Sequence, residues 1–254
     1  DALAQVVTET SRAKIAASVP QYVEDAKALL FALHPQASLV DKTLVWLKAN
    51  TLAAYHGTRL TDEEVASIRT IGLIPLVADN RRARLVRVLS KHPNWTAVAN
   101  RLDAELQKHG NGDQAGQREG QVHLTLSRSS LECSFNHYLL YGSEFDQHVA
   151  TSLLGKDGKA LLQQDGESRV IQVELDGQLA LDGAHAYFTV EDFIQRGEIP
   201  NLVNQFLEAW AYRLAVPTYQ LKHSKTDCGI WFRSSIPSTS IKSIETYAPP
   251  NHDA

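Results

Sequence analysis

Short apolar runs that are typical of strands alternate in this chain with longer segments of helical periodicity. Such runs occupy residues 51–57, 121–127 and 168–176, and two more lie on either side of Pro237. In the second run, Val122, Leu124 and Leu126 alternate with polar residues, which is the period of a strand with one buried face. This order predicts an α+β chain whose strands are separated by helices.

The first 50 residues contain helical patterns alone. Val23, Ala26 and Leu30 recur at helical spacing, and Pro20 is expected to end the helix that comes before them. No linker rich in glycine, serine or proline divides the rest of the chain convincingly. We therefore predict a helical N-terminal extension at residues 1–50 and one main domain at residues 51–254.

Composition limits the classes of function. The 254 residues carry a formal net charge of −4, so the chain as a whole lacks the positive charge of an electrostatic nucleic-acid binder. It contains no apolar run of about 18 residues that would cross a membrane. Cys133 and Cys228 have no CxxC spacing, and we expect two buried thiols in a reducing, cytoplasmic compartment.

Common motifs of catalytic and metal sites are absent from the sequence. There is no phosphate-binding GxxxxGK[ST] loop, no GxSxG nucleophile turn and no HExxH helix. The cysteines and histidines do not have the spacing of a zinc site. We therefore predict no metal, and the order of the elements becomes the main guide to function.

The strand at 51–57 ends in the letters YHG, and a threonine follows. Directly after it, Thr61 and Glu64 form the pattern of a capping box, so a helix should begin at this point. An apolar stripe that includes Ile71 should be buried, and Gly72 stands where a left-handed C-cap belongs. A histidine, a glycine and a hydroxyl therefore lie together where a strand gives way to a helix.

This order of elements resembles the ADP-ribosyltransferase fold. The similarity is to the branch whose first strand carries a histidine, which includes poly-ADP-ribose polymerase-like enzymes, RNA 2′-phosphotransferases and nucleic-acid-modifying toxins. It covers roughly residues 52–247 and rests on "YHGTR…IGL" and on the closing "IPSTSIKSIE". The resemblance implies a split β-sheet core with inserted helices, and NAD as the substrate.

The resemblance also implies roles for particular residues. His56 would bind a ribose hydroxyl, Gly57 would let the backbone approach nicotinamide, and a carboxylate would stabilise the oxocarbenium-like ribose. Two carboxylates compete for the catalytic role, Glu144 after a Gly-Ser break and Asp227 at the start of the strand before Pro237. The other candidate NAD-binding residues are Thr58, Arg59, Thr125, Ser127, Tyr138 and Tyr141.

The function implied is that of an NAD-dependent ADP-ribosyltransferase of a bacterial toxin or phage-defence type. It would cleave NAD and transfer ADP-ribose to a macromolecular acceptor, either a protein or a nucleic acid. One alternative is a catalytically degenerate module that binds NAD, ADP-ribose or RNA in the same cleft. Another is a partner-binding protein in which residues 1–50 dock an antitoxin or another protein.

Basic residues recur at near-helical spacing between residues 81 and 91. Arg81, Arg84, Arg87 and Lys91 form a stripe on the helix side opposite an apolar face. Such a stripe is most often a solvated helix face. It would also suit the phosphates of a nucleic acid, the pyrophosphate of NAD or an acidic partner.

Overall fold

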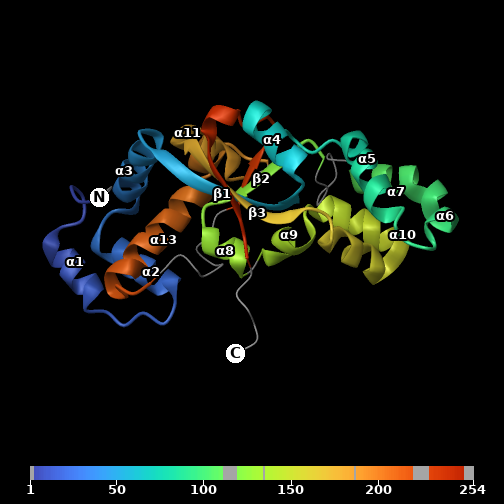
Figure 1. The fold of residues 1–254 in the computed structure, drawn as a ribbon. Coiled ribbons are helices and arrows are strands. Elements are labelled where there is room, and N and C mark those ends of the chain that lie inside the picture. The colour runs from blue at the N-terminus through green and yellow to red at the C-terminus, as the bar shows by residue number, and fades with distance from the viewer. Residues whose placement is uncertain (1–2, 111–118, 134, 186, 220–228, 249–254) are drawn as a thin grey trace. The chain divides into compact units, whose positions relative to one another are not determined.

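The computed structural model describes residues 3–110, 119–133, 135–185, 187–219 and 229–248. Helices and strands make up 58% and 16% of the chain, which confirms the α+β class (Figure 1). Five strands form one sheet in the order β4-β2-β1-β3-β5. The strands are β1 (Thr51–Leu60), β2 (Val122–Thr125), β3 (Glu167–Asp176), β4 (Gly229–Phe232) and β5 (Ile241–Thr246). Strands β3 and β5 pair in antiparallel register.

Helices fill the intervals between the strands. Those before β1 are α1 (Glu9–Ala16), α2 (Val23–Leu33) and α3 (Gln36–Lys48). Those between β1 and β2 are α4 (Asp62–Ile71), α5 (Ala78–Leu89), α6 (Trp95–Val98), the 3-10 turn η1 (Ala99–Arg101) and α7 (Leu102–Gly110). Those between β2 and β3 are α8 (Arg128–Glu132), α9 (Asn136–Tyr141) and α10 (Glu144–Gln163). The rest are α11 (Gly177–Gly183), α12 (Val190–Gln195), α13 (Asn201–Ala215) and η3 (Ser238–Ser240).

The chain divides into two compact units, and the division passes through the strands. The first unit contains residues 1–54, 125–130 and 174–230. The second unit contains residues 55–124, 131–173 and 231–254. Each unit is therefore assembled from segments that are far apart in the sequence. The boundary at residue 50 that the sequence suggests stays a prediction.

In the first unit, α13 packs against α1, α2 and α3. Leu30, Leu39 and Leu207 have no exposed surface and belong to its apolar interior. A partly buried ion pair also joins α2 to α13, because Lys27 Nζ lies 2.5 Å from Glu208 Oε1. The N-terminal helices thus share their packing with a helix near the other end of the sequence.

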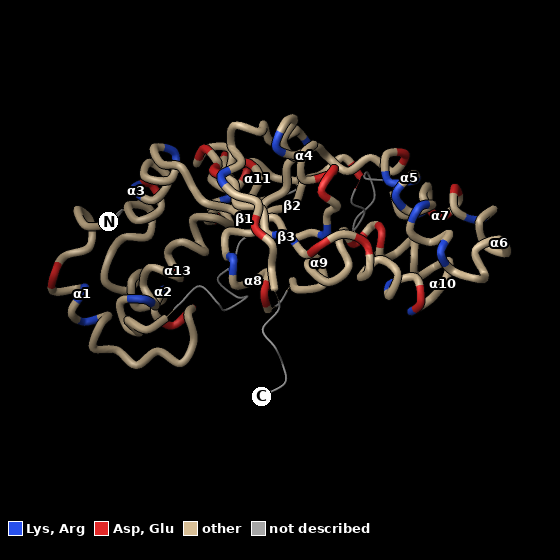
Figure 2. The backbone as a smooth tube through the Cα atoms, viewed as in Figure 1, with Lys and Arg blue, Asp and Glu red and all other residues tan. Residues whose placement is uncertain are grey.

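In the second unit, α10 packs against α5, α7 and α9. Leu85 and Leu89 of α5, Leu106 of α7, and Phe145 and Val149 of α10 belong to one buried cluster. Figure 2 shows basic positions along α5, whereas α10 carries both acidic and basic positions. This apolar cluster supports the elements that carry the candidate site.

The capping box at the start of α4 is confirmed. Thr61 Oγ1 accepts a hydrogen bond from the Glu64 backbone N–H, and Glu64 Oε2 accepts one from Thr61 N–H. The helix ends at Gly72 as predicted, but with φ 89° and ψ −166° rather than in the left-handed helical region. Ile71 is 52% exposed, so the prediction that it is buried is wrong.

Two further sequence expectations concern the cysteines and the membrane. Cys133 is exposed, so the prediction of a buried thiol is wrong there, while Cys228 lies outside the described residues. Cys133 directly follows Glu132, the last residue of α8, and both residues are exposed. In the part of the chain that the structure describes, no helix combines the length and the apolar character needed to cross a membrane.

Candidate functional site

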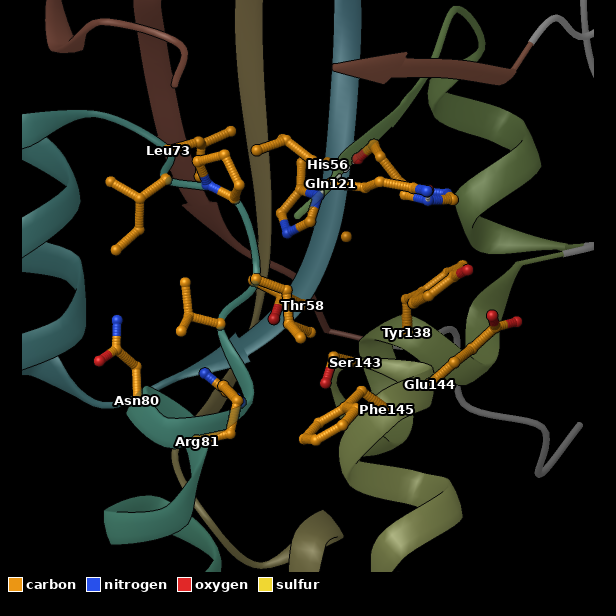
Figure 3. Close-up of a pocket in the computed structure, with 17 residues that line it drawn as sticks. His56, Thr58, Leu73, Asn80, Arg81, Gln121, Tyr138, Ser143, Glu144 and Phe145 are labelled. Carbon is orange, nitrogen blue, oxygen red and sulfur yellow. Dashed lines mark hydrogen bonds between the residues drawn. The ribbon is translucent and has the colours of Figure 1, made fainter. Parts of the chain in front are cut away.

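A cavity of about 200 Å3 lies in the second unit. Strand β1 contributes His56, Gly57 and Thr58, and the segment 73–77 forms an apolar wall. The remaining lining comes from Asn80 and Arg81 of α5, from residues 121–123 at β2, and from Tyr138, Ser143, Glu144 and Phe145 around the α9–α10 turn. Figure 3 shows His56 and Thr58 on β1, with Tyr138 on the helix beside them. A concave, mostly apolar lining with a few convergent polar groups is the usual form of a ligand site.

The apolar wall is held by an isolated pair of backbone hydrogen bonds. Leu73 N–H donates to Ile236 O at 2.9 Å, and Ile236 N–H donates to Leu73 O at 2.8 Å. At Gly72, a side chain would place its Cβ 2.0 Å from Ile236 O, so only glycine permits this approach. The two sequence segments "IGL" and "IPST" are thereby joined beside the cavity.

His56 is fixed in one tautomer. Its Nδ1 lies 2.7 Å from the carbonyl oxygen of His123, so Nδ1 carries the proton and donates to that oxygen. Burial lowers the pKa of His56, the His123 carbonyl partly offsets this effect, and the charge of Arg81 lowers it further. The ring is therefore neutral at pH 7, and Nε2 is a hydrogen-bond acceptor.

The second wall of the site carries a buried charge network. Arg81 of α5 forms a two-point contact with Asp146 of α10, whose side chain is fully buried. Burial by itself would raise the pKa of Asp146, but the charge and hydrogen bonds of Arg81 reverse the effect and lower it. The guanidinium at the cavity is thus held by an ionised carboxylate.

Two neighbouring arginines of α5, one buried and one partly exposed, also pair with carboxylates. Arg87 donates to both carboxylate oxygens of Asp165, at 2.6 and 3.1 Å. Arg84 is only 5% exposed and donates to Glu64 Oε1 at 3.1 Å. The interpretation of the stripe as a solvated face is therefore wrong for Arg84. The guanidinium groups of Arg84 and Arg87 are thus already paired with carboxylates that lie outside α5.

Glu144 lines the cavity from the first turn of α10. Ser143 is the N-cap of this helix and accepts a hydrogen bond from Asp146 N–H at 3.2 Å. Glu144 Oε1 lies 3.2 Å from Nε2 of His137, and its side chain is 24% exposed. Figure 3 shows Glu144 beside Tyr138, on the same side of the cavity. Of the two candidate carboxylates, Asp227 lies outside the described residues.

Other residues chosen from the sequence are packed away from this cavity. Arg59 donates to the carbonyl oxygens of Asp165 and Gly166 and to Ser168 Oγ at 2.9 Å. Tyr141 stacks under Lys159, whose Nζ lies 4.6 Å from the ring centroid. Both residues lie outside the cavity lining.

Thr125 and Ser127 belong to the first unit and are each only 4% exposed. Ser127 Oγ accepts a hydrogen bond from Ser130 N–H at 3.3 Å, which helps to begin α8. Ser127 lines a different cavity, of about 190 Å3, together with Trp46 and Phe206. We call the two cavities the His56 cavity and the Trp46 cavity. The structure thus separates Thr125 and Ser127 from the lining that His56 shares with Glu144.

Gly57 has a packing reason as well as a place in the lining. A Cβ at this position would lie 3.1 Å from a methyl carbon of Leu131 and 3.3 Å from one of Leu139. A larger residue would therefore push these buried side chains aside. Gly57 is therefore needed for packing against Leu131 and Leu139, in addition to the backbone freedom that the sequence suggests.

Asn80 and His137 were not among the residues proposed from the sequence, and Arg81 was considered only as part of the basic stripe. Asn80 and Arg81 line the cavity although they read as part of a basic helix, and His137 binds Glu144 from the preceding helix. The Gly-Ser break at residues 142–143 points to Glu144, but neither Asn80 nor His137 has a sequence signal of its own. Among the described residues, no group of three or more histidine, cysteine, aspartate or glutamate side chains is arranged to hold a metal ion.

Comparisons with known proteins do not indicate a function for this site, so its interpretation depends on the chemistry of its residues. No family model matches the chain, and the searches of curated proteins and of solved structures gave no significant match.

Proposed function

We propose that this chain is an NAD-dependent ADP-ribosyltransferase that acts as a bacterial toxin or phage-defence effector. The observation that carries the proposal is that His56, Gly57 and Thr58 line one cavity with Tyr138 and Glu144. The histidine-type ADP-ribosyltransferase fold, a cytoplasmic location and a macromolecular acceptor are parts of the same proposal.

The size of the His56 cavity suits one part of NAD. Ligand pockets for drug-sized molecules enclose about 300 to 1,000 Å3. A cavity of about 200 Å3 is smaller than this range and would take a nicotinamide ring with its ribose. The adenosine part would then lie outside the cavity. The apolar wall at 73–77 suits a flat heteroaromatic ring.

Each polar group has a specific task in this proposal. Neutral His56 accepts a hydrogen bond at Nε2 from a ribose hydroxyl, which a protonated ring would be unable to do. Tyr138 offers an aromatic face to nicotinamide. Glu144 provides a negative charge for the ribose as its C–N bond breaks.

The reaction balances without any further reagent. The glycosidic bond between ribose and nicotinamide breaks, and nicotinamide leaves with the electron pair. A nucleophilic group of the acceptor forms the new bond to the anomeric carbon and loses its proton. The products are nicotinamide, the ADP-ribosylated acceptor and one proton. Cleavage at an anomeric carbon beside a carboxylate is a chemistry shared with glycosidases.

Nicotinamide release from NAD by the purified chain tests the proposal. We expect turnover in the native protein, its loss in His56→Ala, and no change in His148→Ala, which removes an exposed histidine of α10. Glu144→Gln and Asp227→Asn, measured separately, decide which carboxylate is catalytic. If His56→Ala, Glu144→Gln and Asp227→Asn all turn over NAD at the native rate, the proposed site is wrong.

A degenerate binding module is the second candidate. It is favoured by the lining of the His56 cavity, in which Glu144 is the one acidic side chain among the described residues. In that case calorimetry would detect binding of NAD or ADP-ribose by the native chain, without release of nicotinamide. A protein that docks partners through residues 1–50 would bind neither compound in the His56 cavity.

A further inference from the structure

His137 and Glu144 meet at a sharp turn at the edge of the His56 cavity. His137 belongs to α9, and Glu144 is the first residue of α10. Gly142 makes the turn between them with φ 82°, a value that favours glycine. His137 Nε2 lies 3.2 Å from Glu144 Oε1, and the two side chains are 30% and 24% exposed. The two side chains therefore meet because the turn at Gly142 brings the start of α10 back to α9.

Two further contacts hold the imidazole and the turn. Gln147 is a buried residue whose Nε2 donates to Gly142 O at 2.9 Å and to His137 O at 3.4 Å. The ring of His137 packs on the ring of Tyr138, with 4.2 Å between the centroids. These contacts restrict the imidazole before any ligand is bound.

The two members of the pair stand in different positions relative to the cavity. Glu144 lines it, whereas His137 contacts Glu144 without joining the lining. A glutamate side chain has three rotatable bonds, so a carboxylate that must face a substrate loses entropy when it is fixed. If a hydrogen bond to one carboxylate oxygen already fixes the side chain, less conformational entropy is lost when the substrate binds and reacts.

We propose that His137 is a positioning residue for Glu144, holding its carboxylate toward the nicotinamide-side ribose. The inference rests on the proposed function, because it assigns a task to Glu144 in that reaction. His137 acts through Glu144 and does not touch the substrate. Its removal therefore affects the rate of bond cleavage more than the binding of NAD.

Steady-state kinetics of nicotinamide release test this role. We expect His137→Ala to lower kcat by a factor of about 10 to 100 while KM for NAD stays within about twofold. His137→Gln keeps an N–H donor near the position of Nε2 and should recover much of the loss. His109→Ala is the matched control, because His109 Nε2 lies 3.3 Å from Glu105 away from the cavity. It should leave both constants unchanged.

A double-mutant cycle separates positioning from general damage. If His137 acts through Glu144, adding His137→Ala to Glu144→Gln changes kcat no further. The thermal midpoint of each variant is measured alongside. An unchanged kcat in His137→Ala, or equal losses from His137→Ala in the native and Glu144→Gln backgrounds, overturns the proposal.

A spectroscopic measurement decides the pairing without any enzymatic activity. In ¹⁵N spectra of the histidine side chains, Glu144→Gln should move the Nε2 signal of His137 and leave that of His109 in place. A His137 signal that does not move shows that the pair is absent in solution and overturns the inference. If the signal moves but the native chain releases no nicotinamide, the transferase proposal fails, and with it the catalytic task of His137.

Discussion

The His56 cavity and the Trp46 cavity enclose nearly equal volumes, about 200 and about 190 Å3. Strand β1 contributes to both, with residues 52 and 53 in the Trp46 cavity and residues 56–58 in the His56 cavity. The Trp46 cavity has an aromatic pair, Trp46 and Phe206, and its described lining includes no charged side chain. The two cavities therefore differ in the polar and charged groups of their linings and not in their volumes.

The largest effect that we expect tests the charges around the His56 cavity. Asp146→Asn removes the carboxylate between Arg81 and Arg84 and should lower the free energy of unfolding by about 3 to 5 kcal/mol. Asp103→Asn, which removes the partner of Arg82 in an exposed pair, is the control and should have little effect. Urea unfolding at pH 7 measures both. If the two variants are equally stable, the buried charge network beside the His56 cavity does not stabilise the protein more than an exposed ion pair does.

The same pair makes stability depend on acid. Because the folded-state pKa of Asp146 is lowered from its ordinary value of 3.8, its contribution is fully present above that value. It is lost as the pH falls through the lowered folded-state pKa. We therefore expect the difference between native protein and Asp146→Asn to shrink below pH 3.8. A difference that grows in acid would show that the network is not what holds Asp146 ionised.

The next effect compares the two cavities by activity. His56→Ala should lower the rate of nicotinamide release by about a hundredfold, since it removes a hydrogen bond to the reacting sugar. Ser127→Ala should leave the rate unchanged, because Ser127 lines the Trp46 cavity. Thermal midpoints of both variants check that each is folded. A large loss in Ser127→Ala would return this serine to the NAD site that the sequence suggests for it.

A smaller effect compares two glycines with positive φ, one in each unit. Gly72→Ala places a Cβ 2.0 Å from Ile236 O, whereas Gly197→Ala meets nothing within 4 Å. Backbone strain alone costs about 1 to 3 kcal/mol at such a position. Both variants should be less stable than the native protein, and Gly72→Ala should lose more. If chemical unfolding shows that Gly197→Ala loses more stability than Gly72→Ala, the backbone around the Leu73–Ile236 bridge can move to accept the new Cβ at little cost.

The smallest effect concerns the pH profile. His56 must be neutral to accept a hydrogen bond, and its pKa is lowered from 6.5 by burial and by Arg81. The acidic limb of kcat/KM for NAD should therefore lie below pH 6.5. An acidic limb above pH 6.5 would contradict the proposal that neutral His56 with a lowered pKa accepts the hydrogen bond.

Local signals in the sequence predicted local structure well. Thr61 and Glu64 form the expected capping box because both partners lie within one turn of helix. Gly72 ends the helix as expected, but the backbone angles differ because Leu73 must pair with Ile236, far along the chain. The split-sheet fold implied by the resemblance goes further than the α+β class that the structure supports.

Long-range partners are what the sequence could not supply. The stripe on α5 looks like a solvated surface because Asp146 and Asp165, which neutralise it, lie in later elements. The prediction that Ser127 acts with His56 stays a prediction. The structure places Ser127 in the lining of the Trp46 cavity, and alternation along a strand indicates which face a residue is on but not which residues lie beside it. Glu144 was found because its Gly-Ser break is local, whereas its partner His137 gave no signal of its own.

The backbone bridge between Leu73 and Ile236 has a consequence for synthesis of the chain. One wall of the His56 cavity is fastened to a segment that the ribosome makes long after the wall itself. The cavity therefore remains incomplete while the intervening chain is being made, and closing so long a loop comes late in folding. If the chain acts as a toxin, the pocket would therefore stay incomplete in the producing cell until the segment around Ile236 has been made.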